Sequence, residues 1–130
     1  EEQLDEGGAW GVTYAVGNFT VGYGKSYRAP ETTTATRTAG ATTAEYYENT
    51  GASVAVAVND ELSLSYTIEE SEVSYQTSAT TAYDIDMRSI QAAYSLGGAT
   101  LSVAHAAYDN MSYTNGLDAS ELIIAINFAF

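Results

Sequence analysis

Residues 52–68 read ASVAVAVNDELSLSYTI, and this stretch decides the fold class. Aliphatic or aromatic residues occupy every second position before and after the polar step Asn59-Asp60. A period of two places successive side chains on opposite faces of a strand, and a short polar step between two such runs indicates a hairpin. The stretch therefore predicts two antiparallel strands joined by a two-residue turn at 59–60.

The same rhythm continues along the chain and predicts seven strands in total. Alternating runs flank short turns at 17–18, 59–60 and 97–98, and a last run occupies 121–130. Longer polar stretches at 28–44, 70–86 and 109–119 separate the hairpins. We expect an all-β fold, an antiparallel meander of about seven strands. Each strand is expected to be about 9 to 11 residues long, which is the length that crosses a bilayer in a tilted β-barrel.

The regular alternation of short turns and long loops predicts a topology. All short turns fall at one end of the sheet, which in bacterial outer-membrane barrels is the periplasmic end, and the long loops are extracellular. Residues 1–7 would then lie outside the cell. Closing seven neighbouring antiparallel strands would make the first and last strands parallel, whereas bacterial single-chain barrels have even strand numbers. We therefore expect residues 1–130 to be the C-terminal part of one transmembrane barrel domain, with N-terminal strands missing.

Composition excludes several functional classes. Eleven Tyr, eleven Gly and one Pro suit strands and tight turns, and no apolar run approaches the roughly 18 residues of a membrane-spanning helix. Seventeen acidic residues against four basic ones give a net charge of -13, which repels nucleic acid. No catalytic group assembles around His105, the only histidine, which is expected at the membrane interface. We expect neither an enzyme nor a nucleic-acid partner.

The two faces of the predicted sheet differ in chemistry. In a large barrel the apolar face meets lipid and the polar face lines water. Aromatic side chains near the strand ends of the apolar face are candidates for girdles at headgroup depth: Trp10, Tyr14, Phe19, Tyr23, Tyr66, Tyr94, Phe128 and Phe130. Polar side chains of the opposite face are candidates for lining a pore: Glu69, Glu121, Gln91, Asn127, Ser63, Ser65, Thr67 and Ser102.

The stretches AAYSLGGATL at 92–101 and ELIIAINFAF at 121–130 look like the last three strands of the general diffusion porins of alphaproteobacteria. The rest of the chain agrees with that family only in hairpin rhythm. The terminal Phe130, with apolar residues at alternate positions before it, also resembles the signal read by the barrel-assembly machinery. The resemblance implies a homotrimeric, sixteen-stranded outer-membrane pore for passive diffusion of small polar solutes and ions. This chain would supply strands ten to sixteen, and the family's constriction loop would lie in the missing part.

Charged residues near the long loops allow several roles. The loop acids either concentrate cations at a channel mouth, giving weak cation selectivity, or only keep the loops soluble. Lys25, Arg28 and Arg88 either snorkel toward headgroups or face the pore. We expect no cofactor: the spacing of the loop acids matches no EF-hand, which favours solvated acids over the alternative of Ca²⁺ or Mg²⁺ bound through their oxygen atoms. The candidate ligands are Asp84, Asp86, Asp109 and Asp118.

Two other functions fit the same pattern. A soluble or surface β-sandwich could bind glycans or protein partners through loops rich in Tyr and Thr. A small eight-stranded outer-membrane barrel with a structural or adhesive role would need an eighth strand within 28–44 or 70–85. The alternation from Thr32 to Thr43 is weak, which makes this last alternative the least favoured.

Overall fold

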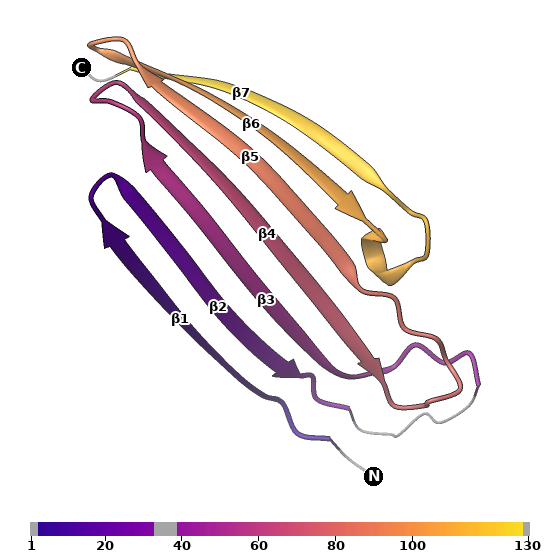
Figure 1. Cartoon of the computed structure of the whole chain (residues 1–130). Helices are drawn as coiled ribbons and strands as arrows, with labels where there is room; N and C mark the ends of the chain where they lie inside the picture. Colours follow the sequence, from indigo (N-terminus) through magenta and orange to yellow (C-terminus); the bar gives the residue numbers. More distant parts are fainter. Residues whose placement is uncertain (1–2, 33–38, 129–130) are drawn as a thin grey trace.

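The computed structural model describes residues 3–32 and 39–128, which form one curved antiparallel sheet (Figure 1). Seven strands in these ranges are hydrogen-bonded in chain order, which confirms the predicted all-β meander. They are β1 (Glu6–Val16), β2 (Phe19–Ala29), β3 (Ala44–Ala57), β4 (Leu62–Tyr75), β5 (Ile85–Ser95), β6 (Ala99–Asp109) and β7 (Ala119–Phe128), with a 3-10 turn η1 (Met111–Tyr113) before β7. No helix in the described residues is long and apolar enough to span a membrane.

The turn at 17–18 has the predicted length, and the turn at 97–98 is one residue longer, since residues 96–98 lie outside the strands. β1 ends at Val16 and β2 begins at Phe19, and Gly17 between them has a φ of 58°. The Leu96 amide donates to the Ala99 carbonyl at 2.7 Å and so encloses residues 97–98. A positive φ is accessible to glycine without steric cost, which suits these tight connections.

The turn predicted at 59–60 is longer than two residues, because residues 58–61 lie outside the strands. The side-chain oxygen of Asn59 accepts hydrogen bonds from the amides of Glu61 at 2.9 Å and Leu62 at 2.8 Å. An Asn side chain can close a turn in place of backbone groups. The alternation of apolar residues does not show whether a turn contains two residues or four.

The predicted strand lengths are wrong for the central hairpin. β3 and β4 each contain 14 residues, longer than the 9 to 11 predicted, and residues 70–75 of the predicted loop at 70–86 belong to β4. In this part Asn49 pairs with Ser71 and Glu48 with Glu72, which puts polar side chains on both faces. The backbone ladder continues there while the hydrophobic alternation stops, and alternation was the signal on which the prediction depended.

The long loops join one another at one end of the sheet. The Gln3 side chain donates to the carbonyls of Pro30 at 2.8 Å and Glu45 at 2.6 Å, and Thr80 donates to the Ala41 carbonyl at 2.9 Å. The buried residues among those described are few. Ala29, Ala44, Val73 and Thr77 lie near this end, and Ser89 and Ala106 pair with each other within β5 and β6. The sheet is therefore a single layer whose middle has no second layer packed on it in the described residues.

An eighth strand is absent from the described parts of 28–44 and 70–85, where Thr32 forms only an isolated bridge with Gln3. The predicted weak alternation from Thr32 to Thr43 falls partly on 33–38, outside the described residues. β1 and β7 are the two ends of the strand order and are not paired with each other. The described sheet is consequently open.

Gly7 and Gly8 offer a matched test of backbone spacing in the β1–β2 ladder. A Cβ at Gly7 would lie 2.9 Å from the Tyr27 carbonyl oxygen, whereas a Cβ at Gly8 would meet nothing within 4 Å. We expect Gly7→Ala to destabilise the folded protein by about 1–2 kcal/mol through steric crowding of the paired strand. Gly8→Ala should be neutral or stabilising, because it only restricts the unfolded chain. Urea unfolding midpoints compare the two, and equal midpoints would contradict the predicted close approach.

Candidate functional site

The strand register assigns every residue to one of two faces. Directly paired residues on neighbouring antiparallel strands point to the same side of a sheet. Tyr14 pairs with Val21, Val21 with Val54, Val54 with Tyr66, and Tyr66 with Ile90. We call the side that carries this row the apolar face.

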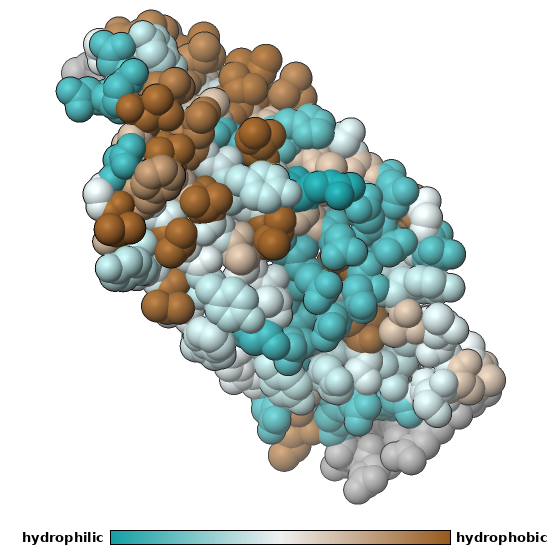
Figure 2. All heavy atoms as spheres, in the orientation of Figure 1, coloured by the Kyte–Doolittle hydropathy of each residue, from teal (hydrophilic) through white to brown (hydrophobic). Residues whose placement is uncertain are grey.

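Large hydrophobic side chains of the apolar face are widely exposed. Ile124 is 63% exposed, Leu122 62% and Ile90 58%. Nothing in the described residues covers these side chains, and a monomeric soluble protein rarely leaves so large a contiguous apolar area in water. Hydrophobic atoms gather toward the short-turn end in Figure 2, and hydrophilic atoms lie over the middle and toward the long loops.

The apolar area crosses the strands obliquely. On β1 the apolar area extends toward the long loops as far as Trp10. The residues aligned with Trp10 on the following strands are polar or charged: Lys25, Thr50, Glu70, Asp86 and Asp109. On β7 the apolar area extends toward the short turns as far as Phe128, which pairs with Ala99 next to the turn at 97–98. If the strands are tilted relative to a barrel axis, an apolar belt that is level with a membrane crosses them obliquely in this way. We call this area the apolar belt.

The predicted girdle residues share the apolar face. The register places there Trp10, Tyr14, Phe19, Tyr23, Tyr66, Tyr94 and Phe128, and Phe130 lies outside the described residues. The Trp10 and Tyr23 rings are 5.6 Å apart, close enough for an aromatic contact. His105 pairs with Ile90 and Leu122, so it also lies on this face.

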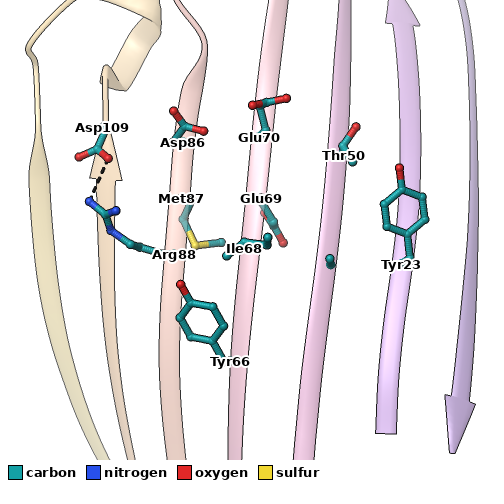
Figure 3. A pocket seen from close by; sticks show the side chains of 11 residues that line it. Tyr23, Thr50, Tyr66, Ile68, Glu69, Glu70, Asp86, Met87, Arg88 and Asp109 are labelled. Atoms are coloured by element: carbon teal, nitrogen blue, oxygen red, sulfur yellow. Dashed lines mark hydrogen bonds and ion pairs between the residues drawn. The ribbon is translucent and has the colours of Figure 1, made fainter.

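Charged residues replace apolar ones on the long-loop side of the belt, which we call the region above the belt. Lys25 donates to Glu48 at 2.6 Å, and Arg88 to Asp109 at 3.0 Å. Lys25 and Arg88 thus share the apolar face, whereas Arg28 lies on the other face and approaches Asp5 at 3.6 Å. Figure 3 shows the Arg88–Asp109 pair above Tyr66 at the boundary, beside a hollow of about 440 Å³.

The four predicted ion ligands do not converge. Asp86 and Asp109 are paired across β5 and β6, but Asp109 holds Arg88. The Asp118 carboxylate accepts the Asn110 amide at 3.1 Å, and the Asp84 carbonyl accepts the Asn110 side chain at 3.1 Å. Within residues 3–32 and 39–128, no group of three or more acidic or histidine side chains is arranged to hold a metal ion.

The predicted pore-lining residues all lie on the opposite face. Ser65 pairs with Gln91 and Glu121 with Ala106, and the remaining candidates keep the same parity: Glu69, Asn127, Ser63, Thr67 and Ser102. A shallow trough of about 280 Å³ crosses from β3 to β7 on this side and is lined by residues that include Ser63, Ser65, Gln91 and Ser102. The sheet is curved (Figure 1), and we call the side that carries this trough the concave face.

Two carboxylates lie on the concave face toward the long loops. Glu69 is exposed and pairs with Gly51, and a Cβ at Gly51 would lie 3.4 Å from the Glu69 Cγ. Glycine at that position leaves room for Glu69 to lie across β3. Glu121 accepts a hydrogen bond from the Tyr108 hydroxyl at 3.0 Å. Carboxylates that remain exposed on a concave surface attract cations to it.

A chain of hydrogen bonds on the concave face was not predicted from the sequence. Asn49 donates to Ser26 at 3.1 Å, Ser71 donates to Asn49 at 2.6 Å, and the hydroxyls of Ser71 and Tyr113 are 2.8 Å apart. Sequence reasoning missed these residues because they lie in stretches that were assigned to loops or to the polar ends of strands. Their polar character was visible, but their alignment depends on the register of strands that lack alternation.

Comparison with known proteins finds no match. No family model fits the sequence, and no curated protein or solved structure is significantly similar to the chain. Fold class and surface chemistry are therefore the basis for a functional proposal.

Proposed function

We propose that this sheet is part of the wall of a bacterial outer-membrane β-barrel of the porin kind, which lets small polar solutes and ions diffuse passively. The observation that carries the proposal is the difference between the two faces of the sheet. One face carries a belt of exposed hydrophobic side chains, and the other carries mainly small and polar side chains. Membrane β-barrels alternate in this way because their outer face meets lipid and their inner face meets water. In this assignment the belt contacts lipid and the concave face contacts the channel.

Closure of such a barrel needs more strands. β1 and β7 are not paired with each other, and unpaired strand edges in a bilayer leave backbone groups without hydrogen-bond partners. We propose that further strands join both edges, as in the sixteen-stranded, trimeric porins that the last strands resemble. Under this proposal the long loops face the cell exterior and the short turns face the periplasm.

Weak cation selectivity is part of the proposal. Glu69 and Glu121 lie on the concave face, while Arg28 on that face is near the carboxylate of Asp5. The net field on this surface is negative, which raises the local concentration of cations relative to anions.

Reconstitution tests the proposed function. The complete polypeptide that contains this sheet should produce stepwise ionic currents when it is added to a planar lipid bilayer, with a linear dependence on voltage. Heat-dependent migration on a detergent gel reports independently whether a barrel has formed. A preparation that is folded and inserted in lipid, but passes no current, would count against the channel.

A further inference from the structure

The connection between β6 and β7, residues 110–118, folds back over the concave face. η1 lies against β5, and Tyr113 in η1 reaches past β5 to β4 and β3. Its hydroxyl is 2.8 Å from that of Ser71, and its ring centroid is 5.7 Å from that of Tyr47. Tyr47 and Ser71 belong to the concave face by the strand register. The loop therefore covers that face, and does not extend the sheet outward.

The loop is held in this direction by its own backbone. Asn110, Ser112 and Tyr113 have φ values of 55°, 56° and 55°, a left-handed conformation that non-glycine residues rarely adopt. The Asn110 side chain accepts the Gly116 amide at 3.0 Å and donates to the Asp84 carbonyl at 3.1 Å. The Met111 amide donates to the Leu117 carbonyl at 2.7 Å. Unfavourable backbone conformations persist only where the surroundings hold them, and they concentrate at functional sites.

Tyr113 also lies next to a hollow. The hydrogen-bonded chain that it ends, through Ser71 and Asn49 to Ser26, borders a space of about 600 Å³ on the concave face, together with Glu69 and Tyr108. Tyr113 is linked to this space through Ser71, which lines the space and whose hydroxyl contacts that of Tyr113. Val73, which pairs with Tyr47, is only 5% exposed, so the surface under the loop is firmly packed.

We infer that Tyr113 is a specificity-determining residue of the proposed channel, the tip of an inward arm that narrows the passage and so limits the size of the polar solutes that cross. This inference rests on the proposed function. A phenol ring fixed by a hydroxyl contact and a ring contact presents a constant obstacle, and the cross-section at the narrowest part of a pore limits its conductance.

Single-channel conductance of the complete polypeptide tests the inference. Tyr113→Ala should raise the conductance roughly 1.5-fold because it widens the passage, and Tyr113→Trp should lower it because the ring is larger. Tyr83→Ala is the matched control, since Tyr83 is an exposed loop tyrosine outside this contact network, and it should leave the conductance unchanged. The conductance of Tyr113→Trp still tests the inference if Tyr113→Ala forms no channels.

The outcomes separate the two proposals. If the wild-type protein forms no channel, the proposed function fails and the arm has no role in permeation. If wild-type channels form but neither variant at position 113 changes the conductance relative to the Tyr83→Ala control, the channel stands and the inference is overturned. Opposite changes for the alanine and tryptophan variants support it.

Discussion

Replacing Ile124 with arginine is expected to lower the free energy of unfolding of the lipid-inserted protein by about 2–4 kcal/mol, the cost of a cation near the middle of a bilayer on the outer face of a barrel. Ile124 lies within the apolar belt on β7, between Leu122 and Phe128, and is 63% exposed. In the proposed membrane wall an arginine there would have no water to hydrate its guanidinium, and its paired residue Val103 offers no acidic partner.

Ile123 provides the matched control on the same strand. It is also widely exposed, at 52%, but it lies on the concave face and borders the trough. Ile123→Arg would place the guanidinium in water and should cost less than about 1 kcal/mol, since surface substitutions have small effects. The comparison therefore removes the contributions of strand propensity, side-chain size and position along the chain.

Urea unfolding in lipid vesicles measures both variants, and fluorescence of Trp10, the only tryptophan, reports the transition. A soluble sandwich gives a different result from a membrane wall. If the apolar face were packed against another layer, Ile124→Arg would also destabilise, but the protein would then fold without lipid or detergent. If the apolar face met water, both variants would be nearly neutral. The proposed membrane wall requires a lipid-dependent fold and a large difference between the two positions.

Sequence alternation predicted the strands only where one face is apolar. The runs around Val54, Leu64 and Ile124 have a period of two because one face of each is hydrophobic, and these parts of the strands were placed correctly. Above the belt, Glu48 and Asn49 pair with Glu72 and Ser71, so neither face is hydrophobic and the pattern disappears although the ladder continues. Periodicity reports the environment of a strand and not the presence of its hydrogen bonds.

The division of residues between the two faces was predicted well for the same reason. Face assignment depends only on parity within a strand, so Glu69 and Tyr66 were assigned to opposite sides before their partners were known. The inward arm was not predictable in this way. The direction of the β6–β7 loop depends on the left-handed residues Ser112 and Tyr113 and on the contact with Ser71, which is distant in sequence. The polar stretch at 109–119 predicted a loop but not the face over which it folds.

If the proposed channel exists, charge reversal at Glu69 should shift its selectivity, and the same change at the next residue should not. We expect Glu69→Lys to lower the cation-to-anion permeability ratio roughly threefold, because a lysine on the concave face replaces an attractive charge with a repulsive one. Glu70 pairs with Thr50 and Asp86 on the apolar face, above the belt. Glu70→Lys changes the net charge by the same amount on the outer side of the wall, and the ratio should remain close to that of the wild type.

Reversal potentials in a salt gradient across a planar bilayer measure the ratio for all three proteins. The difference between the Glu69 and Glu70 variants should shrink as salt approaches 1 M, where the screening length falls to about 3 Å and the charge acts only on ions that almost touch it. Equal shifts for both variants would mean that net charge near the mouth, and not a carboxylate inside the channel, sets the selectivity. A larger shift for Glu70→Lys would reverse the assignment of the two faces, because it would place the charged residues above the belt in the path of the ions.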